Sequence, residues 1–353
     1  MTVERHPRRR FLLSASGGAA GLVLAGAGSG TAFASQLARQ QAAAPQSPLP
    51  SLQPIRQVRT GVLDVGYYET GPANGRPVIL LHGFPYDIHS FVDVAPMLAA
   101  QGFRVIVPHL RGHGTTRFLN ASTPRSGQQG AIGQDVIDLM DALHIEQAVL
   151  AGYDWGGRAA CVAALLGPAR IVGLVTVNGY LVQDIARAGV PISPQVESGL
   201  WYQFYFTTAR GQAGLANNRA GIARVMWKGN SPSWRFDDAT FERTAKSFDN
   251  PDYVAVVIHS YRHRLGLAAG YPEYEAIEKQ LAALPAIRIP AITLDGEDDG
   301  VVPATDGKAS AARFSGPRVH RKVAGAGHNL PQETPAAFAD AVAALARTGN
   351  WHA

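Results

Sequence analysis

The segment Gly152-Tyr153-Asp154-Trp155-Gly156 constrains this chain most, because it places a carboxylate in a glycine-flanked turn between a strand and a helix. The short apolar run 147–151 before it is typical of a buried strand, and the alanine-rich run 158–166 after it is typical of a helix. A sharp turn of this kind holds one side chain exposed above the end of a sheet. An ordinary turn with a helix-capping aspartate fits the pentapeptide equally well.

The order of other polar groups along the chain separates these two interpretations. Residues 292–299 resemble a strand that ends in carboxylates, and His328 lies between a strand-like run, 318–323, and a helix-like run, 335–346. A nucleophile, an acid and a histidine in this order indicate nucleophilic catalysis. Asp299 is the predicted acid because it lies three residues after Gly296, and Asp298 is the alternative.

A fourth motif, His82-Gly83-Phe84-Pro85, follows the apolar run 77–81. Such a loop is expected to supply one backbone N–H of an oxyanion hole, here from Phe84. The residue after the nucleophile, Trp155, is expected to supply the other. His82 itself is interpreted as a structural residue of the loop.

With these motifs the chain resembles the epoxide hydrolases of the α/β-hydrolase superfamily, which are related to the haloalkane dehalogenases, over roughly residues 55–350. The resemblance implies an α/β-hydrolase fold, a mostly parallel eight-stranded sheet with a helical cap inserted after strand six. The implied parts are core residues 55–183, cap residues 184–284 and core residues 285–353. The expected strands are 55–59, 62–70, 77–81, 103–107, 147–151, 171–177, 288–294 and 318–323, with core helices at 91–100, 134–143, 158–166 and 335–346.

The same resemblance assigns roles to two cap segments. Residues 201–206 and 260–262 are similar to the segments that hold the ring-opening tyrosines of epoxide hydrolases, which places these tyrosines at Tyr202 and Tyr261. A phenol is protonated at neutral pH and can donate a proton to a developing alkoxide. Phe84, Trp155 and Trp201 are expected to line the substrate pocket.

The implied reaction converts an epoxide, a small-molecule substrate, to a vicinal diol. Asp154 would form a covalent ester, which a water activated by His328 would hydrolyse, with Asp299 orienting the imidazole. No metal and no organic cofactor are expected. One position departs from the family pattern: His109 stands where an aspartate is usual, and we expect this change to affect loop packing more than chemistry.

Two other functions compete with this one. A haloalkane dehalogenase would share Asp154, Trp155 and His328, but it needs an N–H donor for the halide, typically an asparagine at the position of Phe84. Phe84 has no side-chain donor, and paired tyrosines would have no purpose in that reaction. A ligand-binding relative without turnover is the third possibility.

The N-terminal residues predict export. Arg8-Arg9-Arg10-Phe11-Leu12 fits a twin-arginine signal, and Ala32-Phe33-Ala34 resembles a cleavage site, so residues 1–34 are expected to be removed. Residues 35–54, rich in Gln, Ala and Pro, are expected to be flexible. The protein is therefore expected in the periplasm or outside the cell, with no stable membrane anchor.

Charge and cysteine content agree with a small-molecule enzyme. Of the formal net charge of +5, four arginines and one glutamate lie in residues 1–34, which leaves the rest of the chain with about +2. That excess is too small for a nucleic-acid surface, and no nucleic-acid motif is present. Cys161 is the only cysteine of the sequence, so no internal disulfide can form. The sequence makes no prediction of the oligomeric state.

Overall fold

The computed structural model describes residues 50–351, and the signal segment predicted at 1–34 lies outside the described residues. Residues 50–54 belong to the segment that was expected to be flexible. Leu52, however, is buried against the hydrophobic core, with 3% of its surface exposed. The described end of that segment therefore packs on the fold.

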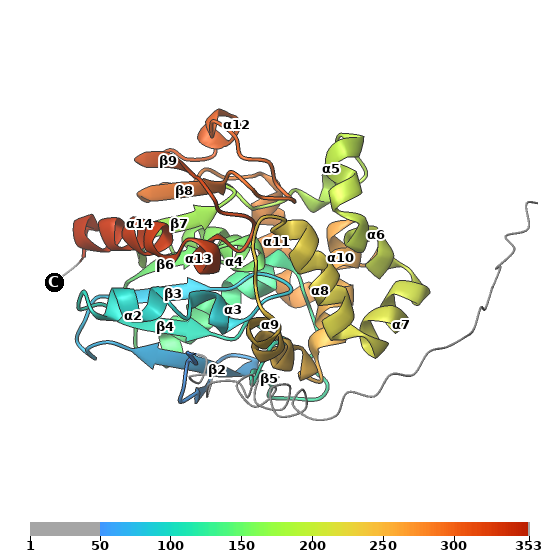
Figure 1. The fold of residues 1–353 in the computed structure, drawn as a ribbon, viewed down its shortest axis with the longest axis horizontal. Helices are drawn as coiled ribbons and strands as arrows, with labels where there is room; N and C mark the ends of the chain where they lie inside the picture. The colour runs from blue at the N-terminus through green and yellow to red at the C-terminus, as the bar shows by residue number, and fades with distance from the viewer. Residues whose placement is uncertain (1–49, 352–353) are drawn as a thin grey trace, which may run out of the picture. The chain divides into compact units, whose positions relative to one another are not determined.

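One mixed sheet forms the centre of the described chain (Figure 1). Its strands run in the order β1-β2-β4-β3-β6-β7-β8-β9, with β5 paired to β2. β1 and β2 are antiparallel, β2 is antiparallel to β4, and the strands from β4 to β9 are parallel. The bounds are β1 (Arg56–Arg59), β2 (Leu63–Thr70), β3 (Pro77–Leu81), β4 (Arg104–Pro108), β5 (Arg117–Phe118), β6 (Ala148–Gly152), β7 (Ile171–Val177), β8 (Ala291–Gly296) and β9 (Arg318–Val323).

Helices cover the sheet in pairs, and this explains its apolar central strands. α3 (Gln129–Ala142) packs on α4 (Asp154–Leu166), while α2 (Val94–Ala99) packs on α14 (Pro335–Thr348). Every residue of β6, β7 and β8 is buried. Parallel strands covered on both faces need such continuous apolar runs. The edge strand β9 instead contains only half-buried and exposed residues.

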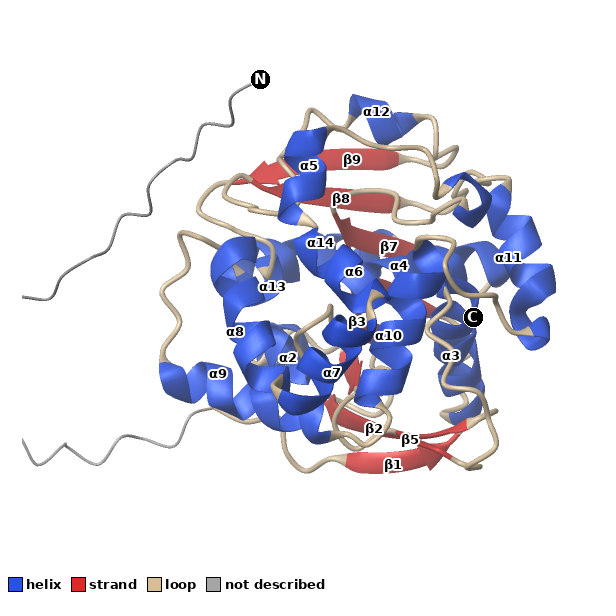
Figure 2. Cartoon of the chain, turned by 90° about the vertical axis from the view of Figure 1, so that its right-hand side faces the viewer, coloured by secondary structure: helices blue, strands red, loops and turns tan. Residues whose placement is uncertain are grey.

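All elements between β7 and β8 are helical, and Figure 2 looks onto them from the cap side. The longest are α8 (Arg219–Asn230) and α10 (Tyr253–Arg264). The others are η2 (Ile185–Arg187), α5 (Pro194–Gly199), α6 (Trp201–Thr207), α7 (Ala209–Asn217), α9 (Asp238–Ala245), η3 (Lys246–Asp249), η4 (Pro272–Tyr274) and α11 (Glu275–Ala282). The remaining short helices are η1 (Ile88–Phe91), α12 (Lys308–Ala311) and α13 (Leu330–Glu333). The predicted α/β fold is confirmed. The helical cap follows β7, which is the sixth strand when the two-residue β5 is left out.

Four local expectations were wrong. Of the helix predicted at 91–100, only α2 (Val94–Ala99) forms, because Phe91 is the last residue of η1, and α4 starts at Asp154 itself. α3 begins five residues before the predicted start at Gln134, and β8 begins at Ala291, directly after Pro290, where 288 was predicted. Proline lacks the N–H that a central strand would donate, which explains the later start of β8.

Candidate active site

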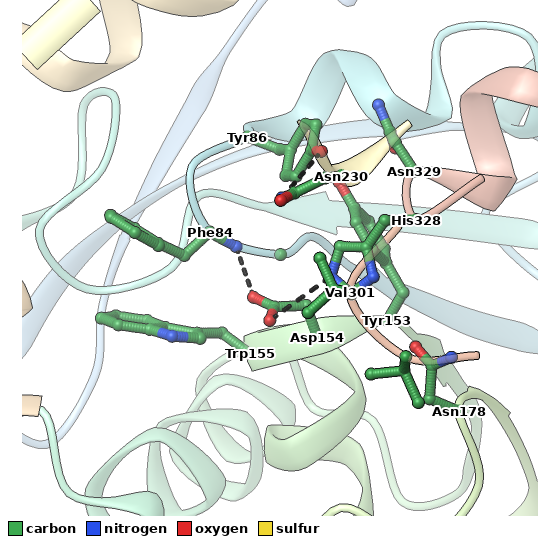
Figure 3. A network of polar contacts seen from close by, with 12 residues as sticks. Phe84, Tyr86, Tyr153, Asp154, Trp155, Asn178, Asn230, Val301, His328 and Asn329 are labelled. Carbon is green, nitrogen blue, oxygen red and sulfur yellow. Dashed lines mark hydrogen bonds and ion pairs between the residues drawn. The ribbon is translucent and has the colours of Figure 1, made fainter. Parts of the chain in front are cut away.

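Asp154 lies at the junction of β6 and α4, with a left-handed backbone φ of 50°. This conformation is strained for a residue with a side chain, and it needs close packing to hold it. The neighbouring glycine supplies that packing: a Cβ on Gly156 would lie 2.0 Å from the carbonyl oxygen of Leu81 in β3. The turn thus carries Asp154 over the end of β3 and β6, where its carboxylate meets two other loops (Figure 3).

Backbone donors hold one side of the Asp154 carboxylate. The N–H of Phe84 donates to Asp154 Oδ1 at 2.7 Å. Burial alone would raise the pKa of Asp154, but the hydrogen bond and charge of His328, with the backbone N–H groups of Phe84 and Trp155, lower it below its ordinary value. Asp154 is therefore ionised at neutral pH, and the two predicted oxyanion-hole donors both lie at its oxygens.

His328 lies on the other side of Asp154, in the loop after β9. Its Nε2 is 3.6 Å from Asp154 Oδ2 (Figure 3). Its Nδ1–H donates to Asp299 Oδ2 at 2.9 Å. Burial lowers the pKa of His328, but the Asp299 charge and the hydrogen bonds to Asp154 and Asp299 raise it to about 10. In the resting site the imidazole is thus a cation between two carboxylates.

The structure distinguishes Asp299 from Asp298. The Asp299 side chain is fully buried, and it accepts from the N–H groups of Val301 and Val302 at 2.8 and 2.9 Å. Asp298 instead accepts from the hydroxyl of Ser233. Asp299 is the carboxylate that reaches His328.

The sequence interpretation missed Asn178, which follows β7 and donates from Nδ2 to Asp299 Oδ2 at 3.2 Å. Its φ of 66° is left-handed, a conformation that asparagine adopts more readily than most residues. An asparagine at the end of a central strand was the available signal. It could not be paired with Asp299 before the strand order was known.

Tyr202 of α6 and Tyr261 of α10 are both buried, and their rings meet edge to face with centroids 5.5 Å apart. Tyr261 Oη accepts the indole N–H of Trp155 at 3.2 Å. The Phe84 ring stacks on Trp155 at 5.2 Å and contacts Tyr261 at 5.5 Å. Tyr261 therefore contacts the aromatic side chains that flank Asp154, and Tyr202 packs against Tyr261.

Both phenols are held protonated. Burial, followed by the charge of Asp154, raises the pKa of Tyr202 to about 12, although a hydrogen bond that involves Tyr261 acts in the opposite direction. Burial likewise raises the pKa of Tyr261 well above its ordinary value. Each tyrosine can thus donate an O–H at neutral pH.

Trp201 differs from Phe84 and Trp155, the other predicted pocket residues, because those two are buried. It is 41% exposed, and its ring contacts Tyr202 and Tyr205. Its aromatic contacts are with these two rings and not with Phe84 or Trp155.

His82 is tied into the loop, as expected for a structural residue. The N–H of Leu110 donates to His82 Nε2 at 3.1 Å, and His82 Nδ1 lies 2.9 Å from the carbonyl of Gly83. Burial and the neighbouring His113 lower the pKa of His82, so the ring is neutral with Nδ1–H donating. Both ring nitrogens are occupied, which leaves none to act as a second base.

Residues 50–351 contain no group of three or more His, Cys, Asp or Glu side chains that could hold a metal ion. Within the same range, none of the helices has the length and apolar character needed to cross a membrane.

Comparison with known proteins agrees with this geometry. A family model described as the alpha/beta hydrolase fold matches residues 76–334. The chain belongs to the α/β-hydrolase family. A solved structure from Klebsiella pneumoniae, provisionally named an epoxide hydrolase, is 50% identical, covers 85% of this chain and all of its own, and superposes with a TM-score of 0.83.

Two curated relatives are more distant. Epoxide hydrolase A of Mycobacterium tuberculosis is 26% identical over 79% of this chain and 93% of its own length. The magnesium-chelatase 30 kDa subunit of Rhodobacter capsulatus is 30% identical over 79% of this chain and 91% of its own. These matches confirm the predicted family and the prediction that the protein is a hydrolase. Because relatives with such different names share the fold, the reaction has to be argued from the site.

Proposed function

We propose that this enzyme hydrolyses an epoxide to a vicinal diol through an ester on Asp154. The arrangement of Asp154 carries the proposal: one carboxylate oxygen accepts from a backbone N–H, and the other faces His328 Nε2. Its lowered pKa keeps it ionised at neutral pH, so it holds no proton to donate and is available to attack carbon. The Klebsiella and Mycobacterium relatives named as epoxide hydrolases support the same substrate class.

In the first half-reaction an Asp154 oxygen attacks an epoxide carbon, the ring C–O bond breaks, and the released oxygen takes a proton. Tyr202 and Tyr261 are suited to donate that proton because both are protonated and buried beside Asp154. Tyr261 accepts from the Trp155 indole and shares a hydrogen bond with Tyr202, so a substrate oxygen that enters between the two phenols would take the place of their mutual bond.

In the second half-reaction a water attacks the ester carbonyl. Formation of the ester removes the charge of Asp154, one of the two charges that hold a proton on His328. The pKa of His328 then falls, and its proton passes to the tyrosinate left by the first half-reaction. The neutral imidazole can then take a proton from the attacking water while Asp299 orients it. The oxyanion forms on an Asp154 oxygen and meets the N–H groups of Phe84 and Trp155. The ester C–O bond breaks, and the leaving alkoxide takes that proton from His328 as the diol is released. The new Asp154 carboxyl group then returns its proton to His328, which restores the resting ion pair.

The alternative dehalogenase reaction is disfavoured by one contact. That reaction needs N–H donors for a departing halide, and the Trp155 indole N–H is already donated to Tyr261 Oη. Phe84, on the other side, offers no side-chain donor.

A single-turnover reaction in oxygen-18 water tests the covalent route. With enzyme in excess over the epoxide, the oxygen-18 label should enter Asp154, where mass spectrometry of its peptide detects it. The diol formed in this first turnover should carry no label. Asp154→Asn should form no diol in the single turnover. Asp298→Asn is the matched control and should be labelled like the wild type. Label in the diol of the first turnover would instead show direct attack by water.

We also propose export by the twin-arginine route, supported by Arg8-Arg9 and by Ala32-Phe33-Ala34 in the sequence. Changing both arginines to lysine should leave precursor inside the cell. Exported protein that began at Met1 would contradict cleavage after Ala34.

A further inference from the structure

Two arginines lie one helical turn beyond the groups of the proposed reaction, on two helices that meet at the site. Arg158 follows Asp154 by four residues on α4, and Arg264 follows Tyr261 by three residues on α10. Residues three or four apart lie on the same face of a helix. The indole N–H of Trp155 on α4 donates to Tyr261 Oη, so these parts of the two helices face each other. Each arginine therefore lies beside a reacting group, on the face that carries it.

The positive charges of the two arginines act on each other. Burial and the charge of Arg264 lower the pKa of Arg158 to about 9, and the opposing attraction of Asp154 does not restore its ordinary value. Arg264 Cζ in turn lies 5.4 Å from the centre of the Tyr261 ring. The carboxylates of the site thus leave the Arg158 cation less stable than it would be in water, although it remains charged at neutral pH.

Neutral amides, and not carboxylates, hold this pair. Within residues 50–351 neither Arg158 nor Arg264 forms an ion pair. Arg158 Nη1 donates to Gln129 Oε1 at 3.4 Å, and Arg264 Nε donates to Gln183 Oε1 at 3.2 Å. Buried or half-buried arginines are ordinarily paired with an anion, so this arrangement leaves a partner to be supplied.

The donors that lack a partner can be reached by a ligand. Among residues 50–351, nothing accepts from Arg158 Nη2 or from Nη1 and Nη2 of Arg264. Of the nitrogens of these two side chains, only Arg158 Nε is both unpaired and inaccessible. Both arginines are half-buried, and the Asp154 side chain keeps 17% of its surface exposed. One ligand can therefore contact the nucleophile and the three free nitrogens.

We propose that the epoxide substrate carries a carboxylate group, which Arg158 and Arg264 bind while Asp154 attacks the ring. The inference rests on the proposed function and adds the substrate class to it. A guanidinium group donates two parallel N–H groups to a carboxylate, which fixes the direction of the bound molecule as well as its charge. One helical turn spans about 5.4 Å, so about four bonds should separate the carboxylate carbon from the nearer epoxide carbon.

The kcat/KM values for 5,6-epoxyhexanoate and for its neutral amide, 5,6-epoxyhexanamide, test this assignment. The wild type should prefer the carboxylate by about tenfold or more, the contribution of a hydrogen bond between charged groups. Arg158→Met or Arg264→Met should reduce the preference severalfold, and the double change should remove it. Arg187→Met takes an exposed positive charge from η2 of the same cap and should keep the wild-type preference.

The preference is a ratio within one protein, so a variant that merely folds less well would lower both kcat/KM values and leave the ratio unchanged. Arg264 also acts on Tyr202 and Tyr261, because its charge partly offsets the rise in pKa that burial causes. If that were its whole effect, both substrates would slow alike. Equal kcat/KM for the two substrates in the wild type, or the wild-type preference in the double variant, would overturn the proposal.

Calorimetric titration with hexanoate and hexanamide, which contain no epoxide, separates this inference from the proposed reaction. The wild type and Asp154→Asn should both bind hexanoate more tightly than hexanamide, and the double arginine variant should not distinguish them. A wild type that opened neither epoxide but bound hexanoate selectively would overturn the reaction and support the carboxylate site. A wild type that opened epoxides but bound the two probes equally would overturn the site alone.

Discussion

Two aspartates share one histidine, and the donors around each carboxylate give them different chemistry. Asp299 is held by two backbone N–H groups and by Asn178, so all of its oxygens are committed to fixed partners. Asp154 sits on a strained turn with one oxygen toward His328 at 3.6 Å. A carboxylate fixed on all sides can orient an imidazole, whereas the less constrained one can reach a substrate carbon. The assignment of roles thus follows from local hydrogen bonding.

His328→Gln should separate the two half-reactions. Glutamine cannot take a proton from water, but the Asp154 carboxylate stays ionised and able to attack. The variant should therefore open the epoxide once and accumulate the ester, visible by intact mass as protein plus substrate. His320→Gln, a histidine on the edge strand β9, should turn over normally. A folded His328→Gln protein that forms no adduct would argue against this division of labour.

The raised pKa of His328 also links stability to pH. The ordinary histidine pKa is about 6.5, and the folded value is about 10. The stabilisation is therefore fully present below pH 6.5 and is lost as the pH rises through 10. Between pH 7 and 10.5, the urea-unfolding free energy of the wild type should fall more than that of His328→Gln, by on the order of a few kcal/mol. Equal slopes would show that the imidazole is not charged in the resting site.

The sequence predicted the residues of this site better than their contacts. Asp154 and His328 were found because their motifs occur in a fixed order beside strands, and Asp299 because of its spacing from Gly296. The Asn178 contact with Asp299 and the Trp155 contact with Tyr261 could not be predicted. Both join segments more than 100 residues apart, so only the folded arrangement reveals them.

At the scale of elements, glycines explain why α3 began earlier than predicted. Gly130 and Gly133 lower intrinsic helix propensity, which favoured a later start. In the fold, however, a Cβ on Gly133 would lie 2.2 Å from Val162 of α4, and one on Gly130 would lie 2.9 Å from Ile277 of α11. These glycines allow close approach between helices, a tertiary gain that outweighs propensity.

The two-residue strand β5 is too short to leave any periodic pattern in the sequence.

Cap helices α6 and α10 each bring one phenol to the site, and their joint removal should abolish ring opening. A positioned general acid typically contributes about a hundredfold or more. Tyr202→Phe or Tyr261→Phe alone should slow pre-steady-state alkylation by an epoxide while the other phenol compensates in part. The double change should nearly remove it, and Tyr205→Phe on the same helix α6 should not matter.

A haloalkane measured in parallel decides between the two enzyme classes. The wild type should prefer the epoxide. If the double tyrosine variant alkylated at the wild-type rate, or if the wild type preferred the haloalkane, the dehalogenase reaction would replace the one proposed.

At the scale of the whole molecule, the fold was predictable because strand-like and helix-like runs alternate up to residue 183 and again after 284. The way in which the cap attaches to the core could not be predicted, since it depends on a few contacts with core loops. The N–H groups of Gly300 and His328 both donate to the carbonyl of Asn230, at the end of α8. One cap residue thus contacts the loops that carry the acid and the histidine.

The indole of Trp227, also on α8, makes the matching contact with the oxyanion loop. Its N–H donates to the carbonyl of Pro85 at 2.7 Å, and its ring stacks on Tyr86 at 4.9 Å. Trp227→Phe would leave the buried carbonyl unpaired, which should lower the urea-unfolding free energy by about 1–3 kcal/mol from the hydrogen bond alone. Because Pro85 adjoins Phe84, whose N–H holds Asp154, epoxide alkylation should slow as well. The exposed Trp201 is the matched control, and Trp201→Phe should change stability little. Wild-type stability in Trp227→Phe would show that other contacts hold the cap on the core.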